Sequence, residues 1–218
     1  MLTFERTEWA RGRRRVAGMD EAGRGPLAGP VFAACVLFDP VAAEEGRAGD
    51  FRGLTDSKQL TPRARVMFYE RLLAHPGVRY GLGEASREEI DAVNILRATA
   101  LAMRRAVEAL ALPLDLVLVD GRPVAGLPAP SLAIVGGDRR SLSIAAASVI
   151  AKVARDRRME DLDRRWPSYG FARHKGYGTR AHLAALDRWG PCPEHRRSFR
   201  PVAVRMGSGD HASASCAG

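Results

Sequence analysis

The sequence predicts an α/β fold built on a mixed five-stranded sheet flanked by helices. Five apolar runs bounded by Gly, Pro or charged residues are typical of strands, and they lie at about 14–20, 30–38, 78–84, 115–120 and 131–136. Segments with helical periodicity lie between and after these runs. The order of three strands, helices, two strands and further helices is satisfied most simply by a mixed sheet covered by helices.

Four helical segments accompany the strands. The first begins at Thr61-Pro62, which have the residue types of an N-cap and first helical position. Its predicted buried face consists of Val66, Tyr69 and Leu72 or Leu73. The second begins near Ser86, which has capping-box spacing to Glu89, and it continues or restarts at Asn94. Its predicted apolar side consists of Leu96, Met103, Val107 and Leu110.

The third helical segment starts at about Asp138 or Ser141 and stops at Pro167. Thr179 caps the fourth, which ends at Trp189-Gly190-Pro191. Residues 41–55 are expected to form a loop, 1–13 a partly flexible lead-in and 207–218 a disordered tail. The residues between them, 14–206, are predicted to form a single domain.

Composition favours a nucleic-acid partner. The 218 residues are 46% hydrophobic, which suits one domain with a substantial core, and they carry a formal charge of +9. Arginine-rich coding bias would produce the same charge, because among the 34 basic residues only Lys58, Lys152 and Lys175 are lysines. The scarcity of lysine makes these three positions informative.

The sequence also predicts a cytoplasmic protein that does not enter a membrane. Its three cysteines have no metal-ligand spacing and are odd in number, which favours reduced thiols. No segment approaches ~18 consecutive apolar residues, and the N-terminal residues contain no apolar signal-peptide core.

The most informative segment combines two adjacent carboxylates with a glycine-flanked arginine. It reads Val16-Ala17-Gly18-Met19-Asp20-Glu21-Ala22-Gly23-Arg24-Gly25-Pro26. Carboxylates at the end of a strand suit a hard cation such as Mg²⁺ or Mn²⁺, and the glycines let the backbone approach a ligand closely. A surface turn with a chance acidic pair is the alternative interpretation.

Asp120 and Asp138 are two further candidate metal ligands. Asp120 ends the most apolar strand, and Asp138 follows two glycines at the start of the third helical segment. Taken singly, each has an ordinary explanation, as a turn residue before Gly121 and as a helix N-cap. Four convergent carboxylates would need cations or protons to relieve their repulsion. A two-metal phosphodiester site, with ions about 3.5–4 Å apart, accounts for the pattern.

These segments resemble the type 2 ribonucleases H, specifically bacterial ribonuclease HII, over roughly residues 14–202. Besides the first string, the resemblance rests on Thr55-Asp56-Ser57-Lys58, Asn94-Ile95-Leu96, Val119-Asp120-Gly121, Gly136-Gly137-Asp138, Ser143–Val153, His174-Lys175-Gly176-Tyr177-Gly178-Thr179 and Arg196-Arg197-Ser198-Phe199. The resemblance implies a ribonuclease H-like core with a helical C-terminal extension. It also implies that Asp20, Glu21, Asp120 and Asp138 are the catalytic, metal-binding acids, holding two Mn²⁺ or Mg²⁺ ions with substrate bound.

The implied substrates are RNA–DNA hybrids and DNA duplexes that contain ribonucleotides. Recognition of RNA requires contact with the 2′-OH, and the backbone of Gly23-Arg24-Gly25 is the candidate for it. In the family, the tyrosine corresponding to Tyr177 contributes to recognition of the junction where RNA is followed by DNA; a buried turn tyrosine is the alternative. Lys58 is expected to face phosphates after a turn made by Asp56, unless it is a solvated loop cation.

Arg173, His174 and Lys175 are expected to hold the strand backbone, although a generic basic loop would look the same. The protein is predicted to be a monomer, and no sliding-clamp contact is evident. Two rival functions remain open at this point. Ribonuclease HIII carries an extra N-terminal domain, for which a catalytic string beginning at residue 16 leaves no room. A catalytically silent duplex-binding module would retain the basic surface but have no need of four acids.

Overall fold

The computed structural model describes residues 1–206, apart from the side chains of 46–48, so the predicted tail at 207–218 lies outside the described part. The five strands are β1 (Val16–Ala22), β2 (Val31–Phe38), β3 (Val78–Ala85), β4 (Leu116–Asp120) and β5 (Ser131–Ile134). They form one mixed sheet in the order β3-β2-β1-β4-β5. β2 is antiparallel to its neighbours β1 and β3, whereas β4 is parallel to β1 and β5. The predicted strands and sheet are confirmed.

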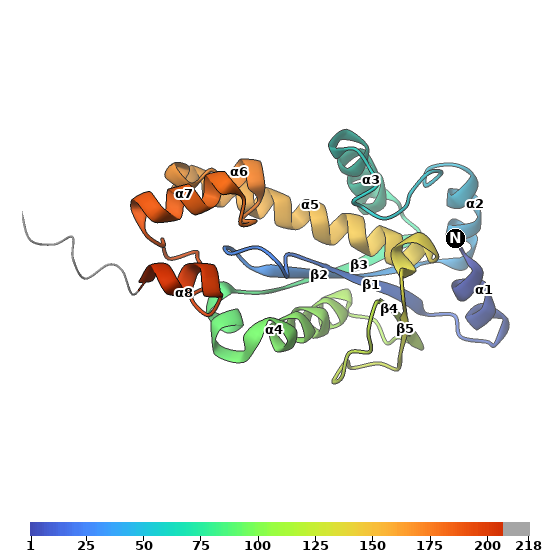
Figure 1. The fold of residues 1–218 in the computed structure, drawn as a ribbon. Helices are drawn as coiled ribbons and strands as arrows, with labels where there is room; N and C mark the ends of the chain where they lie inside the picture. The colour runs from blue at the N-terminus through green and yellow to red at the C-terminus, as the bar shows by residue number, and fades with distance from the viewer. Residues whose placement is uncertain (207–218) are drawn as a thin grey trace, which may run out of the picture.

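Two long helices cover the sheet, one on each face (Figure 1). α5 (Leu142–Arg165) packs on β1 and β2, and α4 (Arg87–Leu110) packs on β2 and β3. Glycines allow this close packing, since a β-carbon at Gly18 would lie 2.1 Å from the carbonyl carbon of Ser143 in α5. Likewise, a β-carbon at Gly81 would lie 2.0 Å from the Ala106 carbonyl oxygen in α4. Separate apolar clusters fill the two interfaces.

The predicted helix starts are confirmed. Thr61 caps α3 (Pro62–Ala74), and Thr179 caps α7 (Arg180–Trp189). Ser86 and Glu89 form the predicted capping box of α4. Ser141, one of the two proposed starts, caps α5 by accepting a hydrogen bond from the amide N–H of Ile144 at 3.2 Å.

Asn94 divides α4 into two helical segments. Its backbone has φ 71°, and its Oδ1 accepts hydrogen bonds from the amides of Leu96 and Arg97 at 3.0 and 3.1 Å. Asn94 therefore caps the second segment, as its predicted restart requires. The turn that follows lies beside an open cleft, where Leu96 is 64% exposed. Of the predicted apolar side, Met103, Val107 and Leu110 are buried, and the placement of Leu96 with them is wrong.

One helix lies where the sequence predicted a loop. α2 (Pro40–Ala48) replaces the first part of the predicted loop at 41–55, because Asp39 accepts hydrogen bonds from the amides of Val41 and Ala42 and Pro40 occupies the first turn.

The predicted buried face of α3 also needs correction. Val66 is 39% exposed, whereas Phe68 and Leu72 are buried in the core beside α5.

The first residues form α1 (Thr3–Ala10), which is attached to the start of α5 rather than being a mere lead-in. The buried Glu5 Oε1 accepts hydrogen bonds from the hydroxyls of Ser141 and Ser143, both at 2.5 Å, and from the Ser143 amide at 3.0 Å. A carboxylate is stabilised at the N-terminus of a helix by its unpaired amides and dipole. Glu5 thus joins the chain's beginning to the helix that covers β1.

The C-terminal extension lies at the opposite end of the sheet from α1 (Figure 1). It contains α7 and the short elements η2 (Pro167–Tyr169), α6 (Phe171–His174) and α8 (Arg200–Met206). These elements share an apolar cluster with Leu27 and Ala28 of the β1–β2 connection. Within residues 1–206, no helix is both long and apolar enough to cross a membrane.

Candidate active site

Three carboxylates converge where β1 and β4 end. Met19 and Val119 are partners in the parallel ladder, so the next residues, Asp20 and Asp120, lie side by side. Asp138 comes from η1 (Gly137–Arg139), whose first amide N–H donates to Asp120 Oδ1 at 2.7 Å. One carboxylate oxygen from each of Asp20, Asp120 and Asp138 lies within 4.8 Å of the others. We call these three residues the acidic triad.

Burial and mutual repulsion destabilise the charged form of the triad carboxylates when no cation is bound. Burial, followed by the charges of Glu21 and Asp120, raises the pKa of Asp20 well above its ordinary value. Burial and the charge of Asp120 also raise the pKa of Asp138. Clustered carboxylate oxygens are the ligands that Mg²⁺ and Mn²⁺ prefer. The residues therefore fit a divalent cation, whose charge would offset the repulsion.

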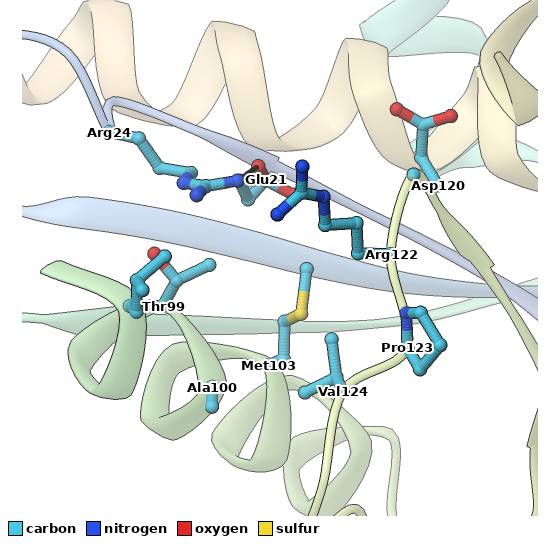
Figure 2. Close-up of a pocket in the computed structure, with 11 residues that line it drawn as sticks. Glu21, Arg24, Thr99, Ala100, Met103, Asp120, Arg122, Pro123 and Val124 are labelled. Carbon is cyan, nitrogen blue, oxygen red and sulfur yellow. Dashed lines mark hydrogen bonds and ion pairs between the residues drawn. The ribbon is translucent and has the colours of Figure 1, made fainter. Parts of the chain in front are cut away.

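Glu21, the fourth predicted ligand, lies beside the triad but outside that group of three. Side chains alternate along a strand, so Asp20 shares the α5 face with Gly18, whereas Glu21 follows Met19 toward α4. Arg24 Nη1 lies 3.1 Å from Glu21 Oε1. Figure 2 shows Arg24 and Arg122 reaching from opposite sides into the cleft that also contains Glu21 and Asp120.

A second cleft of about 360 Å³ lies on the α5 side of the same strand end. Acidic, basic, hydroxyl and glycine residues line it together: Asp20, Glu21, Ala22, Gly23, Arg24, Gly25, Ser57, Lys58, Ser148, Lys152, Arg155 and Tyr177. We call this space the recognition cleft. It brings together most of the predicted substrate-binding residues and part of the predicted metal site.

A buried arginine holds the loop at Gly23–Gly25, which we call the glycine loop. The fully buried guanidinium of Arg196 donates to the carbonyls of Gly23 at 2.6 Å and Arg24 at 3.0 Å, and also to those of Gly29 and Pro30. In a trans peptide the N–H points opposite to the C=O. The amides of Arg24 and Gly25 therefore point away from the Arg196 guanidinium.

A second buried arginine joins the β1–β2 connection to the loop at 174–179, which contains Tyr177 and which we call the tyrosine loop. Arg155 donates to the carbonyls of Ala28, Pro30 and Lys175 at 3.3, 3.1 and 3.0 Å. Gly23 has φ 101°, and a β-carbon there would lie 2.0 Å from Arg155 Nε. Glycine is thus required at position 23 for both backbone conformation and space.

Tyr177 faces the recognition cleft. It is 45% exposed, which contradicts the alternative of a buried turn tyrosine. A β-carbon at Gly25 would lie 3.5 Å from Tyr177 Cε1, so the ring lies directly against the glycine loop. The backbone around the ring is fixed by hydrogen bonds from the Tyr177 amide to the His174 carbonyl and from the Leu27 amide to the Gly176 carbonyl.

The three lysines occupy different surroundings. Lys58 is exposed at the recognition cleft, and its amide donates to Asp56 Oδ1 at 2.9 Å, which confirms the predicted turn. Ser148 attaches this turn to α5, because its hydroxyl donates to Ser57 Oγ at 2.8 Å. Lys152 also lines the cleft and pairs with Asp156 at 2.6 Å.

Lys175 does not bring its ammonium group into the recognition cleft. Its Nζ pairs with Glu160 Oε1 at 2.6 Å, and its backbone has φ 50°. The backbone of Lys175 contributes instead, by accepting the hydrogen bond from Arg155. Arg155 and Arg196 received no role from the sequence, although Arg196 belongs to one of the motifs, because buried arginines cannot be distinguished by composition in an arginine-rich chain.

The sheet order, the acidic triad and the adjoining cationic cleft define a nuclease of the ribonuclease H-like class. The family model for ribonuclease HII matches residues 17–202. Ribonuclease HII from Syntrophotalea carbinolica is 52% identical over 92% of this chain and 92% of its own, and that from Rhodospirillum rubrum is 56% identical over 86% and 85%. The chain belongs to the ribonuclease HII family and is an endoribonuclease.

A solved structure supports the same assignment at the level of the fold. The crystal structure of ribonuclease H2 from Pyrococcus horikoshii OT3 aligns with a TM-score of 0.74 at 28% identity, covering 88% of this chain and 97% of that one. The mixed sheet with a helical C-terminal extension, expected from the resemblance, is thereby confirmed.

Proposed function

We propose that this enzyme hydrolyses the RNA strand of RNA–DNA hybrids and also cuts 5′ to single ribonucleotides embedded in duplex DNA, leaving 5′-phosphate and 3′-hydroxyl ends. The observation that carries the proposal is the shared recognition cleft, in which Asp20 of the acidic triad lies with Gly25 and Tyr177. Its cellular role is then the removal of misincorporated ribonucleotides and hybrid remnants from DNA.

The proposed cofactors are two Mn²⁺ or Mg²⁺ ions. Asp20, Asp120 and Asp138 would hold them, with Glu21 contributing from the neighbouring position on β1. Bound divalent ions activate water and stabilise the leaving oxygen of a phosphodiester. The protein's part is to keep the carboxylates fixed: the Gly137 amide orients Asp120, and the Glu21 amide donates to Asp20 Oδ1 at 2.7 Å.

Recognition of the ribonucleotide is assigned to the glycine loop and Tyr177. The amides of Arg24 and Gly25 point away from Arg196, and such donors suit the oxygen of a 2′-OH. The exposed ring of Tyr177 offers a surface for the sugar next to it. Lys58 and Lys152 place positive charge in the same cleft, where they would attract the phosphates of the strand.

A cleavage assay on matched duplexes tests this proposal. Duplexes of one sequence carry no, one or many ribonucleotides and are incubated with Mg²⁺, Mn²⁺ or a chelator. We expect metal-dependent cuts in the second and third duplexes only, and a cut 5′ to the lone ribonucleotide. Cleavage of the all-DNA duplex, or failure to cut at the lone ribonucleotide, would contradict the proposed specificity.

Tyr177→Ala is expected to reduce cleavage at a lone ribonucleotide more than it reduces binding to an all-DNA duplex. The ring lies against Gly25, whereas backbone charges supply most of the non-specific affinity. Tyr177→Phe keeps the ring and should retain a larger share of activity if ring contact dominates. Equal losses of binding and cleavage on every duplex would leave Tyr177 with a structural role only.

Lys58→Arg is expected to impair turnover or substrate affinity without changing thermal stability. Lys58 is exposed in a cleft that also contains Asp20, where a broad guanidinium must fit around a phosphate. Lys175→Arg is the matched control, because that ammonium group pairs with Glu160. Steady-state kinetics on the single-ribonucleotide duplex measure both variants, and unchanged values for Lys58→Arg would remove Lys58 from the proposed site.

A further inference from the structure

A group of histidines lies behind Tyr177 and takes no part in the proposed chemistry. His182 of α7 and His195 of the following segment are fully buried, and their Nε2 atoms are 3.0 Å apart. His174 stacks on His182 with ring centroids 4.4 Å apart. Two imidazole nitrogens at hydrogen-bond distance require one to donate and the other to accept, so the protonation of the pair can be worked out.

The Tyr177 carbonyl sets the direction of this hydrogen-bond chain. His182 Nδ1 lies 2.9 Å from that oxygen, which can only accept, so Nδ1 must carry the hydrogen. In a neutral ring His182 Nε2 is then an acceptor, and His195 Nε2 donates to it. His195 Nδ1 is left as an acceptor for the buried amide of Cys192, which donates to it at 3.0 Å. The Cys192 carbonyl lies farther from this nitrogen, at 3.3 Å, and already accepts from the His195 amide at 3.1 Å.

Both imidazoles are neutral at neutral pH, as this series of hydrogen bonds requires. Burial lowers the pKa of His182 to about 4 and, likewise, that of His195 to about 4. The rings packed around them are Phe171, Tyr169 and His174, and the His174 ring accepts from the Gly176 amide through Nδ1. A single arrangement of hydrogens therefore runs from the Cys192 amide through two histidines to the Tyr177 carbonyl.

The same segment holds both halves of the recognition cleft. His195 reaches the tyrosine loop through His182, while the next residue, Arg196, holds the carbonyls of Gly23 and Arg24. The ring of Tyr177 and the Gly25 backbone are adjacent. Two neighbouring side chains of the C-terminal extension therefore act on both loops, in addition to Arg155 and the hydrogen bond from the Leu27 amide to the Gly176 carbonyl.

We propose that His182 and His195 are positioning residues that hold the Tyr177 carbonyl, and through it the ring, in the orientation needed to recognise a ribonucleotide in duplex DNA. This role depends on the function proposed above for Tyr177. The histidines touch no substrate atom, so their effect is expected on discrimination between duplexes rather than on the acidic triad.

Two substitutions of His195 separate this role from simple structural support. His195→Gln places an amide N–H near the Nε2 position and keeps a donor for His182, but it lacks the acceptor for Cys192. His195→Asn places an oxygen near the Nδ1 position and keeps that acceptor, but it cannot donate to His182. Loss of one such hydrogen bond is expected to lower kcat/KM for the single-ribonucleotide duplex about tenfold in His195→Asn.

His195→Gln should lose less activity than His195→Asn, while binding to the all-DNA duplex stays unchanged in both. Support of the Cys192 segment alone predicts the reverse order, and that result would overturn the proposal. His75→Asn is a matched control, because His75 Nδ1 accepts from the Gly77 amide at 3.1 Å and neither residue lines the recognition cleft. It should cleave like the unaltered protein.

Tyr177→Ala in the same assay distinguishes a failure of the positioning role from a failure of the role proposed for Tyr177. If Tyr177→Ala leaves single-ribonucleotide cleavage intact, the proposed role of Tyr177 fails and the positioning role fails with it. If Tyr177→Ala is impaired but His195→Asn is not, only the positioning role is overturned. With Tyr177→Ala already present, adding His195→Asn should cause little further loss, because both changes act on one contact.

Imidazole ¹⁵N NMR of the unaltered protein gives a test that needs no substitution. The expected spectrum shows His182 protonated at Nδ1 and His195 protonated at Nε2 at neutral pH. The opposite pair of tautomers, or a charged ring in either residue, would contradict the hydrogen-bond chain even if every His195 variant failed to fold.

Discussion

Asp120→Asn is expected to lower the rate of hybrid cleavage at least about a hundredfold while leaving the fold intact. The change removes one charge from the acidic triad but preserves size. The side-chain oxygen can still accept from the Gly137 amide, which lies 2.7 Å from Asp120 Oδ1. Because Asp120 raises the pKa values of Asp20 and Asp138, its neutralisation relieves repulsion, and thermal stability in chelator should be unchanged or higher.

Metal binding provides an independent measurement. Adding Mn²⁺ or Mg²⁺ should raise the melting temperature of the unaltered protein, since a ligand that binds only the folded state stabilises it. Asp120→Asn should diminish this shift. Asp115→Asn is the matched control, because it keeps a side-chain oxygen that can accept from the Arg15 amide and precedes β4, at the end of the strand away from Asp120. A near-normal cleavage rate for Asp120→Asn in Mg²⁺ would refute the metal-site assignment.

The main parts of the site could be predicted because they depend on local signals. Asp20 and Asp120 each end an apolar strand, and parallel neighbours place such ends side by side. Asp138 was harder to assign from its local pattern alone, because a helix N-cap explained that pattern as well as a metal ligand did. The structure shows that Ser141 caps α5, which leaves Asp138 in the preceding turn to face the triad.

Side-chain partners distant in sequence limited the rest of the prediction. Lys175 is of a residue type that binds phosphate, but its ammonium group is paired with Glu160 of α5. The carbonyls that Arg196 holds at Gly23 and Arg24 are more than 170 residues away in the chain. The His182–His195 pair likewise depends on the packing of α7, and neither histidine has metal-ligand spacing that would have drawn attention to it.

α1 and α2 show two different reasons for a missed helix. Asp39-Pro40 is a readable N-cap and first-turn pair, so α2 was detectable from the sequence despite its weakly apolar composition. α1 has no side-chain cap of its own. Its position depends on Glu5 at the start of α5, a contact with residues 136 positions later that no local pattern reveals.

Arg196→Met is expected to lower the free energy of unfolding by about 3 kcal/mol or more, because buried carbonyls lose a charged donor. The guanidinium serves Gly23, Arg24, Gly29 and Pro30, and although burial lowers its pKa to about 9, it stays protonated at neutral pH. Methionine fills much of the volume but donates no hydrogen bond. Urea denaturation measures the loss.

The same substitution should also impair cleavage at temperatures where the variant remains folded. With its carbonyls released, the glycine loop is free to rotate its peptide planes, and the amides of Arg24 and Gly25 no longer keep one direction. Arg197→Met is the control: it removes an equal charge from the adjacent, exposed position, so any difference between the two variants excludes a general effect of charge on duplex binding. If Arg196→Met matched Arg197→Met in both stability and single-ribonucleotide cleavage, Arg196 would not be what orients the recognition loop.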